Sequence, residues 1–338
     1  MRLHDLFVQT SEMLCLLSCL VACATPLPAS QQNVTNPTSP QVPSSPRPFP
    51  TAQPHVADPT TSSTAASPSP LVYREPFNVK VDVGGYKLSI KCVGTGSPTV
   101  VFDAGLNDTG DKWIKVWTKV KNVTRACIYD RAGRGESDRG PVPRTSQVIV
   151  TELHTLLVNA SIDGPYVLVG HSFGGYNVRL YASQYRDQVA GMVLVDTTHE
   201  DEIDRINALL PPTPGECQAL AASRRQVVNN REGVDFPTSS AQVRQARHTL
   251  GDLPLIVLSR GRASETPAGC DIPASVNQQI DHLHRDLQNQ LAGLSSNSRH
   301  IIAEKSGHYI QLDQPELVID AIVQVVQAAQ TNTRLAPP

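Results

Sequence analysis

Residues 164–180 read GPYVLVGHSFGGYNVRL and contain the pattern that decides the fold. The apolar run at 166–169 is typical of a strand buried on both faces, and Gly-x-Ser-x-Gly follows it at 170–174. A helical pattern begins directly after this motif. A strand, a tight turn carrying Ser172 and a helix form the arrangement in which a serine side chain protrudes as a nucleophile. The competing interpretation is a glycine-rich turn with an incidental serine.

Short apolar runs alternate with amphipathic segments on both sides of this turn. Most runs are apolar throughout, which favours parallel strands covered by helices on both faces. The predicted strands are residues 77–83, 87–93, 98–102, 125–129, 166–169, 190–195, 254–258 and 300–303, and the clearest helices are 147–160 and 315–329. The pattern predicts a doubly wound α/β fold with a mostly parallel, eight-stranded sheet. Residues 197–250 interrupt it with polar, helical and proline-containing sequence, which indicates a small helical lid insertion.

The sequence before residue 71 has a different composition. Residues 24–70 contain 12 Pro, 8 Ser and 7 Thr but only two charged residues, so they bury too little apolar surface to fold and are predicted to be a disordered linker. Residues 13–22 form an apolar run too short to span a bilayer and suited to a signal peptide. The folded domain is therefore expected at 71–338.

The segment Leu20-Val21-Ala22-Cys23 resembles the lipobox of bacterial lipoproteins, in which the cysteine is acylated. Residues 1–23 would then be a signal peptide with its lipobox, and Cys23 would attach the chain to the outer face of a bacterial membrane. The alternative is a plain secretory signal and a secreted protein. Both interpretations predict export.

Charge and cysteine content limit the partners. The net charge is −2 and the basic residues are scattered, which argues against nucleic-acid binding. The four cysteines of the domain, Cys92, Cys127, Cys217 and Cys270, lack the close paired spacing of a zinc site, and no motif calls for a dinucleotide or another cofactor. The expected partner is a small-molecule substrate.

Three motifs together resemble the α/β-hydrolase superfamily, over about residues 71–338. They are YDRAGRGESD at 129–138, GPYVLVGHS at 164–172, and SGH at 306–308 followed by Gln311 and Pro315-Glu316. In that family they correspond to the loop after strand four, the nucleophile turn after strand five, and the histidine loop. The resemblance implies the α/β-hydrolase fold and a serine hydrolase of esterase type. A serine nucleophile excludes the aspartate-dependent haloalkane dehalogenases and epoxide hydrolases of the family.

Ser172 requires a general base, and His308 occupies the position that the resemblance assigns to it. A structural role for this histidine is the alternative. His171 adjoins the nucleophile on a tight turn, so its ring is expected to point elsewhere. His282 and His284 lie in a charged, helix-like segment and are predicted to face solvent.

The acid that orients the base departs from the commoner family pattern. The loop after the seventh strand, residues 259–265, lacks an Asp at the usual place. Asp196 ends the sixth strand, where some family members keep this acid, and is favoured over Glu265 and Asp271. Helix capping after the strand is the alternative role for Asp196.

The backbone N–H groups of Phe173 and Leu106 are the candidate oxyanion hole. The usual His-Gly pair of the family is replaced by residues 103–106, Asp-Ala-Gly-Leu. The resemblance also makes strands two and four antiparallel neighbours, which implies a disulfide between Cys92 and Cys127. A second pair, Cys217–Cys270, would tie the lid to the loop after strand seven; free thiols are the alternative for both pairs.

The sequence thus predicts an exported enzyme that cleaves carboxylic esters through an acyl-enzyme on Ser172. The first alternative is an aminopeptidase or amidase of proline-iminopeptidase type, whose substrate amine would bind Glu200, Asp201, Glu202 or Asp204. The second is a non-catalytic ligand-binding protein on a hydrolase scaffold.

Overall fold

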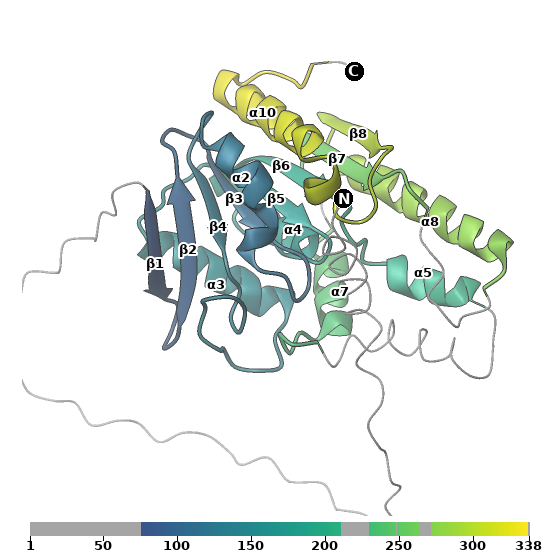
Figure 1. Ribbon diagram of the computed structural model, residues 1–338, viewed down its shortest axis with the longest axis horizontal. Helices are drawn as coiled ribbons and strands as arrows, with labels where there is room; N and C mark the ends of the chain where they lie inside the picture. Colours follow the sequence, from purple (N-terminus) through teal and green to yellow (C-terminus); the bar gives the residue numbers. More distant parts are fainter. Residues whose placement is uncertain (1–75, 211–229, 248, 264–271, 337–338) are drawn as a thin grey trace, which may run out of the picture. The chain divides into compact units, whose positions relative to one another are not determined.

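Eight strands form one sheet in the order β1-β2-β4-β3-β5-β6-β7-β8 (Figure 1). Strand β2 runs antiparallel to both of its neighbours, β1 and β4, and every other pairing in the sheet is parallel. The computed structural model describes residues 76–210, 230–247, 249–263 and 272–336. The strands are β1 (Phe77–Asp82), β2 (Lys87–Val93), β3 (Thr99–Asp103), β4 (Ala126–Tyr129), β5 (Tyr166–His171), β6 (Val189–Val195), β7 (Leu255–Arg260) and β8 (Ser298–Ala303).

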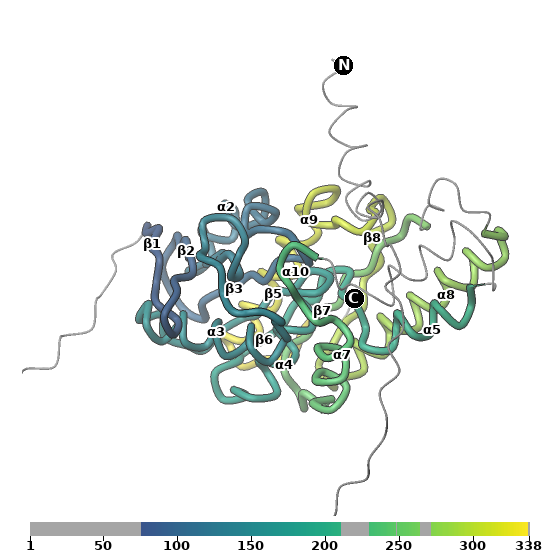
Figure 2. The backbone as a smooth tube through the Cα atoms, turned by 90° about the horizontal axis from the view of Figure 1, so that it is seen from below, coloured from purple at the N-terminus to yellow at the C-terminus, as the bar shows by residue number. Residues whose placement is uncertain are grey.

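Helices cover both faces of this sheet (Figures 1 and 2). On one face lie α2 (Ile114–Val120), the short α9 (Ile310–Asp313) and α10 (Pro315–Thr331). On the other lie α3 (Ser146–Asn159), α4 (Gly174–Gln184) and α8 (Ala274–Ala292). Two short 3-10 turns, η1 (Gly110–Trp113) and η2 (Arg186–Gln188), precede α2 and β6. The eight predicted strands and the two predicted helices are confirmed, with small shifts at their ends.

Alternation along the central strands produces two apolar cores. In β6, Met192 and Leu194 face the core under α3 and α4, whereas Val193 and Val195 face the core under α10. Successive strand residues point to opposite faces, so a strand that is apolar throughout fills both cores at once. This burial fixes the register of the strands whose ends carry the candidate site.

The hairpin and the disulfide lie at the β1 edge of the sheet. Gly84 and Gly85 adopt positive φ values of 119° and 100° in the turn between β1 and β2, which suits residues without a Cβ. Cys92 in β2 lies opposite Cys127 in β4, and the two are joined by a disulfide with a Cα–Cα distance of 4.2 Å. This is the pairing that the family resemblance implied.

The direction of chain progression reverses at the centre of the sheet. The chain passes from β3 to β4 on one side, and β5 then pairs with β3 on the other. Loops that leave neighbouring parallel strands in opposite directions open a crevice at the carboxyl ends of those strands. The loop after β3 and the turn after β5, which carries Ser172, both begin at this point.

The predicted insertion contains two described helices, α5 (Glu202–Leu209) and α7 (Phe236–Gln245). Helix α5 packs its apolar side, including Ile206, on Ile280, Leu283 and Leu287 of α8. Helix α7 begins at a proline-containing first turn, with Asp235 accepting a hydrogen bond from the Thr238 N–H. None of the helices among residues 76–210, 230–247, 249–263 and 272–336 is long and apolar enough to cross a bilayer.

Several sequence-based predictions lie outside the described residues. These are the signal peptide and lipobox at 1–23, the linker at 24–70, and the residues Cys23, Cys217, Cys270, Glu265 and Asp271.

Candidate active site

Ser172 occupies the strained turn that the motif predicts between β5 and α4. Its φ is 51°, in the left-handed region that non-glycine residues rarely adopt. The Ser172 carbonyl accepts hydrogen bonds from the N–H groups of Gly175 and Thr198, and its N–H donates to the Val195 carbonyl. The turn is thereby held from α4 and from the segment after β6, and the Ser172 side chain is half-buried.

Glycine is required on both sides of this serine because the backbone packs too closely for a side chain. A Cβ at Gly170 would lie 2.7 Å from Val178 Cγ2 and 2.9 Å from the Gly174 carbonyl carbon. A Cβ at Gly174 would lie 2.4 Å from the Asp103 carbonyl oxygen. The second contact shows that the loop after β3 lies directly against the first turn of α4.

His308 and Asp196 are brought together from sequence positions 112 residues apart. His308 Nδ1 lies 2.6 Å from Asp196 Oδ2, a hydrogen bond in which the imidazole N–H donates to the carboxylate. The carboxylate of Asp196 is fully buried, whereas 38% of the His308 side chain is exposed. Among the described residues, His308 Nε2 has no hydrogen-bond partner, Ser172 included. This nitrogen is therefore available to exchange a proton.

His171 packs beside His308 and positions its backbone. The ring centroids of the two histidines are 4.6 Å apart, and His171 Nε2 lies 2.9 Å from the His308 carbonyl oxygen. Because a carbonyl can only accept, His171 Nε2 carries the proton. Burial lowers the pKa of His171 to about 3, so the ring is neutral at pH 7. His171 thus supports the histidine loop as a neutral donor.

Four donors converge on the carboxylate of Asp196. Oδ1 accepts from the Arg260 backbone N–H at 2.9 Å and lies 2.9 Å from His284 Nε2. Oδ2 accepts from His308 and from the Arg260 guanidinium at 3.2 Å. Burial disfavours the charged form, but Arg260 and the hydrogen bonds from the two histidines hold the pKa of Asp196 well below its ordinary value. Asp196 is therefore ionised across the working pH range of proteins.

His284 contradicts the sequence-based prediction that it faces solvent. It is 3% exposed and lies between Asp196 and Glu202, with its Nδ1 2.9 Å from Glu202 Oε1. The prediction was wrong because His284 occupies the buried stripe of α8, three and four residues from apolar positions. The stripe consists of Ile280, Leu283, His284, Leu287, Gln288 and Leu291. This spacing was the signal available in the sequence.

Arg260 is the second residue that sequence reasoning missed. It ends β7, where the family usually continues toward its acid, and here it donates to an acid on the neighbouring strand. A charged residue at the end of a buried strand is a sequence signal for a functional position. Its partner, however, depends on the pairing of β6 with β7.

The loop after β3 is held by a buried arginine. Arg131 Nη1 donates to Asp103 Oδ1 at 2.5 Å and to the Ala104 carbonyl at 2.6 Å, and Nη2 donates to the Gly105 carbonyl at 2.5 Å. Asp103 also accepts from the Tyr129 hydroxyl at 2.7 Å. These bonds fix the peptide planes immediately before Leu106, the residue predicted to contribute an oxyanion N–H.

Glu232 is the second carboxylate that pairs with Arg131. Its carboxylate accepts from Arg131 Nε at 2.8 Å and Nη2 at 2.7 Å, and from the Asn107 N–H at 2.5 Å. One buried cation thus faces two carboxylates, Asp103 and Glu232. The second carboxylate comes from the predicted insertion, so the insertion is tied directly to the loop after β3.

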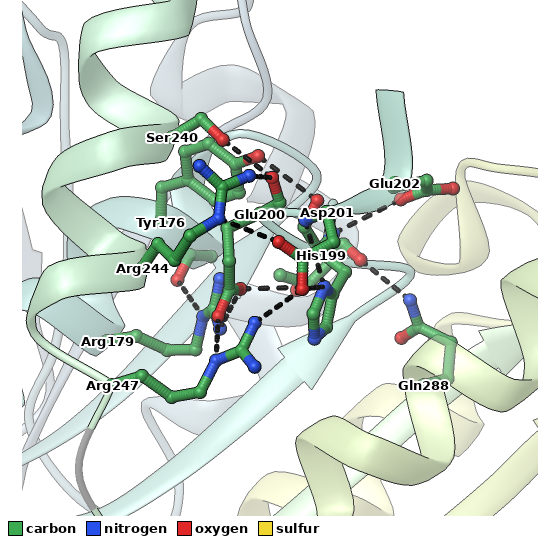
Figure 3. Close-up of polar contacts among 12 residues, drawn as sticks. Tyr176, Arg179, His199, Glu200, Asp201, Glu202, Ser240, Arg244, Arg247 and Gln288 are labelled. Atoms are coloured by element: carbon green, nitrogen blue, oxygen red, sulfur yellow. Dashed lines mark hydrogen bonds and ion pairs between the residues drawn. The ribbon is translucent and has the colours of Figure 1, made fainter. Parts of the chain in front are cut away.

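The acidic run after β6 forms a separate ion-pair network (Figure 3). Glu200, 2% exposed, pairs with Arg179 of α4 at 2.8 Å and with Arg247, which follows α7, at 2.6 Å. Burial opposes the carboxylate, but Arg179 and His199 outweigh it and lower the pKa of Glu200 to about 2. The network holds α4 and the end of α7 together.

The other three acidic side chains of the run are also paired. Asp201 accepts from Arg244 at 2.8 Å and from Arg247 at 2.7 Å, and Asp204 lies 3.5 Å from Arg244. Glu202 contacts His284 and accepts from the His199 N–H at 3.1 Å. All four carboxylates proposed to bind a substrate amine therefore have protein partners.

Two cavities lie near these side chains. Arg260 and His284 line a cavity of about 210 Å³, and another of about 170 Å³ lies between α4 and the end of α7. Ser172 and His308 line neither cavity, so neither is the acyl pocket that a serine hydrolase needs. Within the described ranges, no group of three or more His, Cys, Asp or Glu side chains is placed to hold a metal ion.

Comparisons with known proteins agree with this architecture. The profile of a family described as alpha/beta hydrolase fold matches residues 98–259. The uncharacterized protein YqjL of Bacillus subtilis is 29% identical over 244 residues, covering 70% of this chain and 86% of YqjL.

Two solved structures show the same fold at low sequence identity. A thermophilic esterase from Thermogutta terrifontis is similar with a TM-score of 0.53 and 20% identity, covering 75% of this chain and 99% of the esterase. A bromoperoxidase from Bacillus anthracis gives a TM-score of 0.52 and 14% identity, covering 74% of this chain and 100% of the bromoperoxidase. The chain therefore has the α/β-hydrolase fold.

Proposed function

We propose that this protein is a serine hydrolase that cleaves carboxylic esters through an acyl-enzyme on Ser172, with His308 as the base and Asp196 as the acid. The observation that carries the proposal is the pairing of His308 with buried Asp196 beside the strained turn that presents Ser172. The match to the α/β-hydrolase profile and the structural similarity to the Thermogutta terrifontis esterase support a hydrolytic activity for this chain.

The proposed reaction follows from these positions. His308 Nε2 removes the Ser172 Oγ proton, and Oγ attacks the acyl carbon of the ester. The C–O bond to the alcohol then breaks, and the alkoxide takes its proton from His308. Water, deprotonated by the same nitrogen, attacks the acyl-enzyme and releases the carboxylic acid and Ser172. Asp196 stabilises the His308 imidazolium throughout.

The tetrahedral intermediate carries a negative oxygen that needs preorganised donors. The proposed donors are the N–H groups of Phe173 and Leu106. Phe173 begins the helix behind Ser172, and Leu106 follows the peptides that Arg131 holds by their carbonyls. Fixed carbonyls mean fixed N–H directions, which is the property that an oxyanion site requires.

The experiment that tests the proposal compares wild type with Ser172→Ala on p-nitrophenyl acyl esters of increasing chain length. Removing the nucleophile is expected to lower kcat by roughly 10³- to 10⁶-fold and to abolish labelling by a fluorophosphonate probe. A Ser161→Ala variant, which changes another serine with positive φ, serves as the control. Unchanged turnover in Ser172→Ala would refute the assignment.

The aminopeptidase alternative is less well supported by the contacts of the acidic run. Binding an amine at Glu200 would require displacing Arg179 or Arg247, and at Glu202 displacing His284. Faster turnover of prolyl amides than of neutral esters would nevertheless favour it. A folded protein that binds esters but neither turns them over nor reacts with a fluorophosphonate would favour a non-catalytic binding protein.

We further propose that the chain is exported and anchored through acylated Cys23, with plain secretion as the alternative. Residues 24–70 would then act as a tether on the order of 40 Å long, from about 5–6 Å × √n for a flexible chain. Incorporation of a fatty-acid analogue that is lost in Cys23→Ala tests the anchor.

A further inference from the structure

His284 is a buried histidine, 3% exposed, that the proposed reaction does not use directly. Its Nε2 lies 2.9 Å from Asp196 Oδ1 and its Nδ1 lies 2.9 Å from Glu202 Oε1. A carboxylate oxygen accepts hydrogen bonds, and a neutral imidazole has only one N–H. Two carboxylates can both be satisfied by His284 only when the ring carries both protons and is therefore positively charged.

The surroundings of both carboxylates favour their ionised forms. Glu202 uses its other oxygen to accept from the His199 N–H, and Asp196 accepts from Arg260 and His308. Burial alone would favour the neutral His284 ring, but the hydrogen bonds that the ring donates to Asp196 and Glu202 raise the pKa of His284 to about 9. The geometry and the electrostatics point to the same protonation state.

The contact between Arg260 and His284 raises the alternative that the His284 ring is neutral. Arg260 Nη1 lies 2.8 Å from His284 Nε2 and 3.2 Å from Asp196 Oδ2. A neutral His284 would accept from Arg260, but its Nε2 lone pair would then face Asp196 Oδ1. With His284 charged, two cations, Arg260 and His284, lie among three carboxylates. These are Asp196, Glu202 and Asp281, the last of which lies 3.9 Å from Arg260.

We propose that His284 is a positioning residue of the candidate active site: as an imidazolium between Asp196 and Glu202, it fixes the Asp196 carboxylate toward His308 and partly neutralises it. The kinetic part of this inference rests on the proposed function. The bridge thereby sets how strongly Asp196 interacts with the His308 imidazolium that forms during the proposed reaction. The same bridge links the candidate acid to α5, the first helix of the predicted insertion.

The charged and titratable groups around the two histidines come from several elements. Those facing His284 are Asp196 after β6, Glu202 of α5, Arg260 of β7, His300 of β8, and Asp281 of α8 itself. Those near His308 are Asp196, His171 of β5 and Asp108 before η1. Burial lowers the pKa of His300 and of His171.

The test measures kcat/KM against pH for His284→Gln, which keeps a hydrogen-bond donor but removes the charge. The midpoint of the acid limb is expected to move to higher pH by about 0.5–1 unit, because one cation near the base has been lost. His282→Gln is the matched control, since His282 lies two residues away on the exposed side of α8. Its acid limb is expected to coincide with that of wild type.

A purely structural role predicts a different result. His284→Gln would then lower kcat by the same factor at every pH and leave the midpoint of the acid limb within about 0.2 unit of wild type. That outcome would overturn the proposal.

Nitrogen NMR of the full chain with ¹⁵N-labelled histidine supplies a readout independent of catalysis. In wild type the His284 ring is expected to titrate near pH 9, and in Glu202→Gln at least about one unit lower, because one carboxylate partner is lost. This variant keeps the test decisive if His284→Gln does not fold. A His284 ring that titrates below pH 7 in wild type would overturn the proposal, whereas activity that survives Ser172→Ala would refute only the proposed function.

Discussion

Asp196 and Glu200 are two buried acids on one short segment after β6, and they differ in their partners. Asp196 is held by His308, His284 and Arg260, and one of these partners, His308, is partly exposed. Glu200 is held by two arginines, Arg179 and Arg247, and also faces buried His199. Both carboxylates are kept ionised at neutral pH by opposing charges that outweigh burial.

The difference between their partners separates a carboxylate that can take part in proton transfer from one that stabilises the fold. A histidine can gain or lose a proton near neutral pH, so a carboxylate beside it can assist proton transfer. An arginine stays charged under all physiological conditions and does not exchange a proton, and burial lowers the pKa of His199, the histidine beside Glu200, to about 4. Of the two acids, Asp196 is therefore the one that contacts a partly exposed histidine. Under the proposed function, Asp196 is therefore expected to act in catalysis and Glu200 to stabilise the fold.

The largest expected effect is on catalysis, in Asp196→Asn. An amide cannot stabilise the His308 imidazolium and favours the wrong tautomer of the ring, so kcat on p-nitrophenyl esters should fall by roughly 10³- to 10⁴-fold. Circular dichroism checks that the variant is folded. A variant with near-normal kcat would break the comparison, because Asp196 would then be no more than another structural acid.

The next effect is on stability, in Glu200→Gln. The buried guanidinium of Arg179 would lose its ionic partner, which is expected to lower the free energy of unfolding by roughly 3 kcal/mol. Urea denaturation measures this difference. The kcat of the folded variant should stay within a few-fold of wild type; a loss comparable to that of Asp196→Asn would contradict the division of roles.

The pH dependence of the same pair sharpens the comparison. A carboxyl whose pKa is lowered on folding contributes stability above its unfolded value, and the contribution disappears as pH falls through the folded value. Folding lowers the pKa of Glu200 from 4.5 to about 2. The difference in unfolding free energy between wild type and Glu200→Gln should therefore be full near pH 6 and shrink between about pH 4.5 and 2. A difference that is constant over this range would show that Glu200 is not ionised in the native state.

The smallest effect is expected for Arg247→Ala. The Arg247 side chain is 38% exposed, so solvent screens its ion pairs, and Arg179 still neutralises Glu200. A loss of about 1 kcal/mol or less in the free energy of unfolding is expected from urea denaturation. A loss as large as that in Glu200→Gln would mean that Arg247, rather than Arg179, is the main partner.

The sequence predicted most of the fold because local patterns carried it. The apolar strands, the glycine turn at Ser172 and the long C-terminal helix each depend on residues that are close together in the chain. The same holds for the candidate nucleophile, since a strand, Gly-x-Ser-x-Gly and a helix are contiguous. The prediction for His284 was wrong because the neighbouring charged residues Arg285 and Asp286 face solvent, whereas His284 lies on the buried stripe of α8.

The residues that the sequence did not indicate act across the sheet or across loops. Arg131 reaches Glu232 over 101 sequence positions, and Arg260 reaches Asp196 over 64. No spacing rule connects such pairs, because their distance depends on strand order and on the path of the insertion. A family resemblance supplies the usual positions of the acid and the oxyanion loop, but not the substitutions that this chain makes there.

By itself, the sequence determined that this protein is an α/β domain with a serine on a strained turn, because periodicity and glycine placement are local properties of the chain. Only the tertiary structure decided which further charges are paired, including Arg260 and His284 with Asp196, the acid that the family resemblance already favoured. The physical reason is burial: a carboxylate removed from water is stable only beside the donors that folding brings to it, and those donors come from distant segments.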